Sequence, residues 1–215
     1  RLRLIERSEL GAGNYGHVVL GTLDEGSPTA RRVAVKRLKA VGTRGERVRL
    51  VKRLARELNI WSKITHPNVV DLIGYCLDER YESPQLVSAL MPHGNILGYI
   101  QRFGPGIGQR VAFVKGITAG LACLHNSTPP ICHADLKPDN VLIDLHMNAV
   151  LCDFGLASFV GGSENSPGLV TSTTIKGTAR YMSRELLADN CQHSLESDVW
   201  AWACTAFQVC RLRGG

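Results

Sequence analysis

The spacing of apolar residues changes about a third of the way along the chain, and this change most constrains the fold. Before it, β-rich apolar runs at 17–20 and 32–36 flank a polar turn at 24–28, which predicts a hairpin. After it, apolar residues recur mainly at helical spacing, over residues 46–64, 96–103, 109–125 and 194–210. Shorter strands are expected at 69–76, 85–91, 141–143 and 149–152. The pattern predicts an α+β fold.

Composition restricts the class of protein. The 215 residues are 44% hydrophobic and 20% charged, which is typical of a globular chain and excludes a disordered tail, a collagen-like repeat or a membrane channel. The first ten residues contain no apolar signal sequence, and the apolar run 199–210 is too short to span a bilayer. We expect no targeting or membrane segment. The seven cysteines form no C-x-x-C pair, so reduced thiols in an intracellular, cytoplasmic protein are favoured over disulfides or a zinc site.

Positive charge is concentrated in one segment. Residues 31–57 carry 11 of the 25 lysines and arginines but only two acidic residues, so their formal charge is +9 and that of the remaining chain is −3. Two interpretations remain open. The segment could bind nucleic acid or acidic lipid, with an affinity that falls steeply with salt. It could also be a solvated face around a phosphate-binding lobe, which we favour, so no nucleic-acid partner is expected.

A glycine-rich string precedes the first hairpin. Gly11, Gly13, Gly16 and Val18 form a G-x-G-x-x-G-x-V pattern, which is weak by itself. A dinucleotide-binding motif would need a helix directly after the glycines, whereas here a strand follows and Lys36 stands twenty residues after Gly16. Glycines without Cβ atoms let backbone N–H groups approach phosphate oxygens. The pattern therefore favours a phosphate-binding hairpin over a plain turn beside a solvent-exposed lysine.

Glu57 lies between Leu54 and Trp61 on the apolar side of the predicted helix. Buried carboxylates are rare unless they are paired, so this side chain needs a cation. Lys36 is the expected partner, because an ion pair would hold its ammonium toward a phosphate. The alternative is an exposed glutamate that pairs with Arg53 on the same helix face.

The richest cluster of polar residues is His133-Ala134-Asp135-Leu136-Lys137-Pro138-Asp139-Asn140, followed thirteen residues later by Asp153-Phe154-Gly155. Together with the glycine string, Val33-Ala34-Val35-Lys36, the helical Glu57, residues 177–182 and residues 197–200, this series resembles the eukaryotic protein kinases. The resemblance covers essentially the whole chain. Small-molecule phosphotransferases share the first cluster but normally lack the second, so they match less well.

The resemblance implies a bilobal fold and a role for each of these residues. Residues 1–91 would form the small lobe and hinge, and residues 92–215 would form an incomplete large lobe. Asp135 would accept or orient the proton of a substrate hydroxyl, and Lys137 would neutralise the transferring phosphoryl group. Asn140 and Asp153 would bind Mg²⁺. Val18, Ala34 and the hinge residues Ser88 to Met91 would contact the adenine of ATP. Thr178 would contact Asp135 and Lys137.

By the same resemblance, Lys137 and the segment Gly177-Thr178-Ala179-Arg180-Tyr181-Met182 indicate the serine/threonine class, and residues 66–76 indicate its tyrosine-kinase-like branch. The expected reaction is transfer of the ATP γ-phosphoryl group to a protein hydroxyl. The alternative is an inactive or truncated kinase-like module that binds nucleotide or a partner protein. Asp139 is expected to be a solvent or capping residue. Thr171, Ser172, Thr173 and Thr174 are candidate phosphorylation positions, and the alternative is a flexible linker that carries no modification.

Three departures from the family pattern modify this expectation. Ala134 stands where most of the family has an arginine that binds a phosphorylated loop, so activity is expected not to depend strongly on such a phosphate. Ser183-Arg184-Glu185 replaces Ala-Pro-Glu. The family's last helices are missing after residue 211, so the apolar helix at 194–210 is expected to expose a face that a partner could cover.

Overall fold

The computed structural model describes residues 2–13, 16–24, 26, 30–38, 43–77, 84–160, 178–188 and 192–211. Most of the predicted turn at 24–28 and all of Thr171–Thr174 lie outside this range. The chain divides into two compact units. The first comprises Arg1–Val51 and Val70–Met91, and the second comprises Lys52–Val69 and Pro92–Gly215. The helix α1 (Arg44–Trp61) therefore contributes its first residues to one unit and its last ten to the other.

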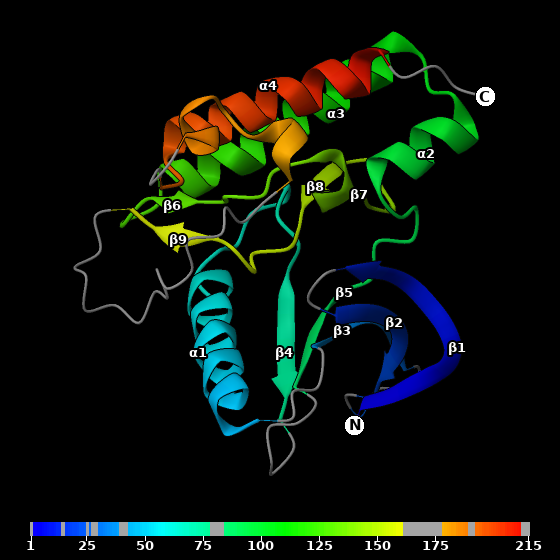
Figure 1. The fold of residues 1–215 in the computed structure, drawn as a ribbon. Helices are drawn as coiled ribbons and strands as arrows, with labels where there is room; N and C mark the ends of the chain where they lie inside the picture. The colour runs from blue at the N-terminus through cyan, green and yellow to red at the C-terminus, as the bar shows by residue number, and fades with distance from the viewer. Residues whose placement is uncertain are drawn as a thin grey trace. The chain divides into compact units, whose positions relative to one another are not determined.

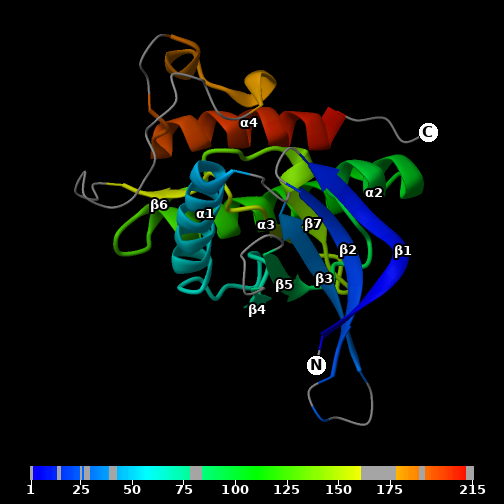
Figure 2. The ribbon, with the colours of Figure 1, turned by 60° about the horizontal axis from the view of Figure 1, so that its bottom comes forward.

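The first unit is built on a five-stranded antiparallel sheet with the order β1-β2-β3-β5-β4, whose first strands curve side by side in Figure 2. Its strands are β1 (Leu2–Gly13), β2 (Gly16–Leu23), β3 (Arg31–Leu38), β4 (Leu72–Cys76) and β5 (Gln85–Ala89). The β2–β3 pairing confirms the predicted hairpin. The sequence pattern does not predict β1, because charged residues interrupt its apolar ones.

The two faces of this sheet differ in burial. Val33, Val35 and Val87 are buried on one face and form a core cluster with partly buried neighbours such as Val19. Because side chains alternate along a strand, the residues between them lie on the opposite face. That face contains the buried Leu86 but is otherwise only partly buried in the middle of the sheet.

The second unit is mainly helical. In Figure 1, α3 and α4 lie side by side, with α2 near one end of the pair. The helices are α2 (Ile96–Phe103), α3 (Ile107–His125), α4 (Leu195–Arg211) and the last part of α1, with short 3₁₀ turns at Pro138–Asn140, Ala179–Tyr181 and Glu185–Leu187. Two small antiparallel pairs complete the unit, β6 (Ile131–Cys132) with β9 (Ser158–Phe159) and β7 (Val141–Ile143) with β8 (Ala149–Leu151).

Local signals explain where these helices start and how closely they approach their neighbours. The Asn95 side chain accepts a hydrogen bond from the Gly98 N–H (2.8 Å) and caps α2. Ser194 and Ser197 exchange backbone-to-hydroxyl bonds (3.0 and 3.2 Å) at the start of α4. A Cβ at Gly120 of α3 would lie 2.6 Å from the Asn68 carbonyl oxygen, so only glycine permits this approach.

Among the described helices, α3 alone is long and apolar enough to cross a membrane by length and composition. Sequence reasoning considered only residues 199–210 for this role and passed over α3. Its side chains Phe113, Ile117, Leu121 and Leu124 are buried within the unit. A core helix of a globular protein passes the same test of length and composition.

The helix α4 combines a buried side with an exposed apolar one. Ala201, Thr205 and Val209 are buried, whereas Trp200 is 50% exposed and Phe207 is 63% exposed. The exposed side lines an open groove of about 700 Å³, whose walls also include Arg180, Gln208 and Arg211. The Tyr181 hydroxyl donates to Gln208 at 2.6 Å and so joins the 3₁₀ turn Ala179–Tyr181 to this helix.

Candidate active site

Asp135 lies at the centre of a set of short polar contacts in the second unit. Lys137 Nζ donates to Asp135 Oδ2 at 2.7 Å and to Thr178 Oγ1 at 2.8 Å, and the Thr178 hydroxyl donates to Asp135 Oδ1 at 3.2 Å. The Asn140 amide also donates to Asp135, to its carbonyl oxygen at 2.8 Å and to Oδ2 at 3.2 Å. The predicted contact of Thr178 with Asp135 and Lys137 is confirmed.

The carboxylate and the ammonium remain in part accessible. The Asp135 side chain is 12% exposed and the Lys137 side chain is 20% exposed. A hydroxyl group that approaches Asp135 would meet a carboxylate already held in position by its neighbours. Such a fixed carboxylate can act as a general base, and an adjacent ammonium can stabilise negative charge on an incoming group.

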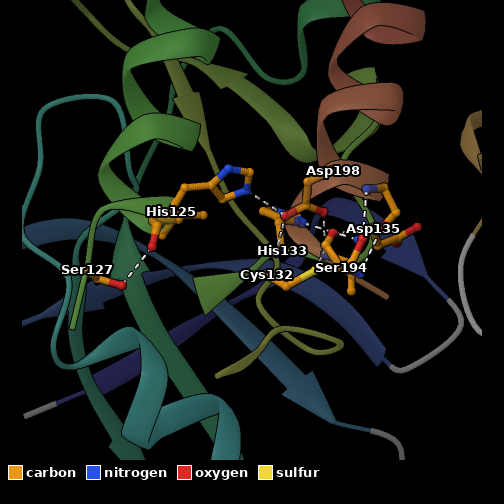
Figure 3. A network of polar contacts seen from close by, with 10 residues as sticks. His125, Ser127, Cys132, His133, Asp135, Ser194 and Asp198 are labelled. Atoms are coloured by element: carbon orange, nitrogen blue, oxygen red, sulfur yellow. Dashed lines mark hydrogen bonds and ion pairs between the residues drawn. The ribbon is translucent and has the colours of Figure 1, made fainter. Parts of the chain in front are cut away.

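The backbone before Asp135 is held by Asp198, a buried carboxylate near the start of α4 (Figure 3). Asp198 Oδ2 accepts from the His133 N–H at 2.7 Å, and Oδ1 accepts from the Ala134 N–H at 2.9 Å. His125 Nε2, at the end of α3, donates to Asp198 Oδ2 at 3.1 Å. Ala134 has φ 67°, in the left-handed region that non-glycine residues rarely adopt. Two bonds to one carboxylate hold the backbone in this conformation.

The protonation of this network follows from its partners. Burial by itself would raise the pKa of Asp198, but hydrogen bonds from His125 and from the backbone N–H groups of His133 and Ala134 outweigh it and keep the pKa below its ordinary value. Asp198 is therefore ionised at neutral pH. Burial, and then the nearby Asp198 charge, raises the pKa of the Cys132 thiol, which bonds the Ser194 carbonyl at 3.3 Å and stays protonated.

The β7–β8 hairpin brings the second predicted cluster beside the first. The Cys152 N–H donates to the Asn140 carbonyl at 3.0 Å, so Asp153 follows directly after a residue that is bonded to Asn140. Asp153 has φ 65°, and its Oδ1 accepts from the Gly155 N–H at 3.4 Å. His133 connects both clusters, because Nδ1 accepts from the Asp135 N–H at 3.3 Å and Nε2 donates to the Cys152 carbonyl at 3.2 Å.

A third set of predicted residues gathers in the first unit. Val18 pairs with Lys36, and Lys36 pairs with Leu86 on the next strand; Ala34 pairs in the same way with Ser88. Directly opposed residues of antiparallel strands share a face, so Val18, Ala34, Lys36 and Ser88 all lie on the partly exposed face of the sheet. Met91 follows β5 by two residues and is partly buried.

The glycine string forms the end of the β1–β2 hairpin. Gly11 pairs with Val18, and Gly13 pairs with Gly16. A Cβ at Gly16 would overlap the carbonyl oxygen of Arg37, so this position requires glycine for steric reasons. No neighbouring atom lies within 4 Å of a Cβ built on Gly11, so packing does not explain that glycine.

Glu57 is 1% exposed in the part of α1 that belongs to the second unit. Its burial confirms the expected buried position and excludes the alternative of an exposed glutamate. Lys36 belongs to the first unit, so the predicted ion pair between these two side chains stays a prediction. Asp139 is exposed in the 3₁₀ turn Pro138–Asn140, as expected for a solvent or capping residue.

Sequence reasoning gave no role to three side chains that organise this site. Asp198 holds the backbone before Asp135, His125 donates to Asp198, and Arg56 donates to the Gly155 carbonyl at 3.3 Å. The signal for Asp198 was available, because an acidic residue in an otherwise apolar helix must find buried partners. No comparable signal exists for Arg56, which is one of several cations on a basic helix.

Residues 4–213 match the family described as the protein kinase domain. The chain belongs to this family. Among its relatives in Arabidopsis thaliana, "Probable serine/threonine-protein kinase PBL11" is 35% identical over 213 residues, which cover 94% of this chain and 52% of that protein. A second relative, "L-type lectin-domain containing receptor kinase I.3", is 33% identical over 204 residues, which cover 93% of this chain and 28% of that protein. The chain thus spans about half the length of PBL11.

The family assignment bears out the wider predictions. The α+β protein kinase fold expected from the motifs is confirmed. The serine/threonine class, also expected from the motifs, is the one that the name of PBL11 carries. Protein kinase domains use ATP and a divalent metal ion, so both ligands follow from membership in the family. The relatives include receptor kinases as well as PBL11.

Proposed function

We propose that this chain is the catalytic domain of a serine/threonine protein kinase, which transfers the γ-phosphoryl group of ATP to hydroxyl groups of protein substrates. The observation that carries the proposal is the arrangement of Asp135, Lys137 and Thr178, joined by contacts of 2.7 to 3.2 Å. This arrangement offers a fixed carboxylate to a hydroxyl and a fixed ammonium to a phosphoryl group. Phosphoryl transfer depends mainly on such positioning and electrostatic stabilisation.

In this mechanism Asp135 orients the substrate hydroxyl and accepts its proton as the oxygen attacks the phosphorus atom. Lys137 remains beside Asp135 and stabilises negative charge on the transferred oxygens. Thr178 keeps the two groups together, since its hydroxyl accepts from Lys137 and donates to Asp135. The proton then leaves Asp135 to solvent, while the phosphoryl group stays on the substrate and ADP departs.

The amide oxygen of Asn140 and the carboxylate of Asp153 form a donor set that suits Mg²⁺, which prefers oxygen ligands and usually binds few protein groups together with phosphates. The Asn140 amide nitrogen is directed at Asp135, which leaves its oxygen as the ligand atom. When bound, the metal supplies positive charge to the phosphate oxygens. Asn140 and Asp153 would hold it, and the bond from Gly155 N–H to Asp153 would orient the carboxylate.

We propose that the partly exposed face of the first sheet binds the nucleotide. Val18 and Ala34 would cover the adenine, and the backbone from Ser88 to Met91 would recognise its edge. Lys36 would hold the phosphates, oriented by Glu57, and the Gly11, Gly13 and Gly16 backbone would approach them. The common face of Val18, Ala34, Lys36 and Ser88 supports this assignment. Residues 1–91 would act as the small lobe with its hinge and residues 92–215 as the large lobe.

The test compares phosphate transfer from radiolabelled ATP to a generic basic protein by the wild type and by Asp135→Asn. We expect the variant to lose about 10²- to 10⁴-fold in rate, the usual contribution of a general base. Its affinity for a fluorescent ATP analogue should stay unchanged, because Asp135 does not lie on the sheet face assigned to the nucleotide. Equal rates from both proteins would contradict the enzymatic proposal. Nucleotide binding without transfer by the wild type would favour the alternative, an inactive binding module.

We also propose that a partner surface covers the exposed face of α4 in the working protein. Trp200 and Phe207 are at least half exposed there beside a groove of about 700 Å³, and exposed apolar areas of this kind usually mark contact sites. Phe207→Gln should reduce self-association of the isolated chain in size-exclusion chromatography. The matched control is Phe103→Gln, at a phenylalanine that is 52% exposed on α2. Equal behaviour of both variants would contradict the proposal.

For the protein's location we propose the cell interior, specifically the cytoplasm. The described cysteines Cys76, Cys123, Cys132, Cys152, Cys204 and Cys210 are all free thiols, which is typical of reducing compartments. ATP is also available there as the phosphoryl donor. Expression as a fluorescent fusion in plant or animal cells would test the proposal, and an extracellular signal would contradict it.

A further inference from the structure

One side chain of α1 reaches the turn that contains Asp153. Arg56 Nη2 donates to the carbonyl oxygen of Gly155 at 3.3 Å, and both residues belong to the second unit. The two positions are 99 residues apart in sequence. A hydrogen bond from a charged donor is stronger than one between neutral groups, so this contact is well suited to hold a backbone carbonyl.

The turn is arranged so that this contact can act on Asp153. Gly155 bonds in two directions, since its N–H donates to Asp153 Oδ1 at 3.4 Å and its carbonyl accepts from Arg56. Fixing the carbonyl limits rotation of the residue whose N–H orients the carboxylate. Asp153 itself has φ 65°, a conformation that persists in non-glycine residues only where the surroundings hold it.

Neighbouring contacts place the last part of α1 along the same segment. The rings of Trp61 and Phe154 lie 5.7 Å apart, and the ammonium of Lys63 lies 5.0 Å from the centre of the Phe159 ring. Trp61 at the end of α1 thus contacts the beginning of the segment 154–159, and Lys63, just after α1, contacts its end. Among these contacts, only that of Arg56 reaches a backbone group of the Asp153 turn directly.

We propose that Arg56 is a positioning residue for the metal-binding carboxylate of Asp153 and acts through Gly155. The inference rests on the proposed function, in which Asp153 binds the metal ion. Partners that orient a metal ligand from outside typically contribute tenfold or more to metal affinity. Removal of Arg56 should therefore weaken metal binding without removing a ligand.

The experiment measures Mn²⁺ binding by electron paramagnetic resonance, with the 215-residue chain and a non-hydrolysable ATP analogue. Arg56→Met should raise the Mn²⁺ dissociation constant about tenfold. Arg56→Lys, which keeps the charge and a donor, should stay within about threefold of the wild type. Lys52→Met is the matched control, because it removes one positive charge from an exposed position on the same helix, and it should bind Mn²⁺ as the wild type does.

Two further readouts separate positioning from general damage to the structure. Affinity for the analogue in the presence of a chelator should be unchanged in Arg56→Met, since the first sheet would bind the nucleotide without the metal. Hydrogen exchange of a peptide covering residues 153–159 should be faster in this variant than in Lys52→Met. If Arg56→Met fails to fold, the comparison is made between Arg56→Lys and Arg56→Gln, which must then differ in Mn²⁺ affinity at equal melting temperature.

The outcomes distinguish the two proposals. If Asp153→Asn binds Mn²⁺ as tightly as the wild type, or the wild type binds none, the assignment of the metal site and this inference both fail. If Asp153→Asn loses Mn²⁺ but Arg56→Met behaves like Lys52→Met, only the positioning role is overturned. Equal Mn²⁺ affinities of Arg56→Lys and Arg56→Gln would overturn it in the same way.

Discussion

The two carboxylates of the proposed site are held in different ways. Asp135 is held mostly by its own motif, since Lys137 and Asn140 follow within five residues and both donate to it. The turn at Asp153 is held in part by Arg56, from a helix almost a hundred positions earlier. The difference teaches that a catalytic carboxylate can be oriented in large part by side chains of its own motif, whereas the adjoining metal-binding turn is also held by a side chain that its own motif does not contain.

Both carboxylates nevertheless lie at a strained point of the backbone. Ala134, directly before Asp135, has φ 67°, and Asp153 itself has φ 65°. A left-handed conformation costs a non-glycine residue roughly 1–2 kcal/mol, so something must stabilise each of them. For Ala134 the stabilising group is Asp198, whose carboxylate binds two successive backbone N–H groups. Replacing this buried carboxylate should therefore have the largest effect on the protein.

The largest effect is expected from Asp198→Asn. The amide nitrogen would take the place of one carboxylate oxygen, so its hydrogens would face either the Ala134 N–H or both His125 and the His133 N–H, all of which donate to Asp198 in the folded chain. Leaving buried donors without an acceptor, together with loss of a charge-assisted network, should lower the free energy of unfolding by about 3 kcal/mol. Urea denaturation followed by circular dichroism measures this loss. Phosphate transfer should fall as well, because the backbone before Asp135 loses its support.

Asp139→Asn is the control for this variant, because it changes an exposed carboxylate in the same loop and should alter stability by no more than about 0.5 kcal/mol. The contribution of Asp198 to stability should also depend on pH. The folded pKa of Asp198 lies below its unfolded value of about 3.9, so its contribution is complete above that pH and is lost as pH falls through the folded pKa. The stability gap between wild type and Asp198→Asn should therefore be constant from pH 5 to 7, as rough limits, and narrow below about pH 4. If the stability difference between the two proteins stayed constant below about pH 4, it would contradict the stabilising role assigned to the Asp198 charge.

A smaller effect, confined to activity, is expected at Thr178. Thr178→Val removes a hydroxyl that accepts from Lys137 and donates to Asp135, while nearly preserving the volume of the side chain. Two hydrogen bonds of about 1 kcal/mol each should lower kcat about thirtyfold, with little change in the KM for ATP. Thr178→Ser retains the hydroxyl and should remain within about threefold of the wild type. Steady-state kinetics would contradict this role if the valine and serine variants proved equally active.

Sequence reasoning was most successful where a family motif or a helical period identifies the residue. The contacts of Thr178 with Asp135 and Lys137 were expected from the kinase resemblance, and the structure has both of them. The burial of Glu57 was expected from its place on an apolar helix face and is also observed. The helical period by itself places Glu57, whereas Thr178 lies more than 40 positions from Asp135 and was identified only through the family's motif.

Other features were out of reach because they depend on contacts between distant segments. The strand β1 has interrupted apolar residues, and only its pairing with β2 makes it a strand. The carboxylate of Asp198 meets the backbone of His133 across 65 positions, and Arg56 meets Gly155 across 99. The pairing of Lys36 with Glu57 stays a prediction of the same kind, since it would join residues of two separate units. Nothing in the local spacing of these residues encodes such contacts.

The smallest effect is expected from the segment beyond the Asp153 turn, at Thr171–Thr174, which lie outside the described residues. A phosphate on such a loop acts by pairing with a cation near the catalytic carboxylate. Here the position before Asp135 holds the buried methyl side chain of Ala134, which cannot bind a phosphate, and the loop backbone is already fixed by Asp198. Replacing Thr171, Ser172, Thr173 and Thr174 with alanine should therefore leave transfer to the basic protein within about twofold of the wild type. Thr178→Val supplies the contrast, since it removes a hydroxyl that contacts Asp135 directly. Abolished transfer in a folded quadruple variant would contradict this prediction and would mean that another cation binds a loop phosphate.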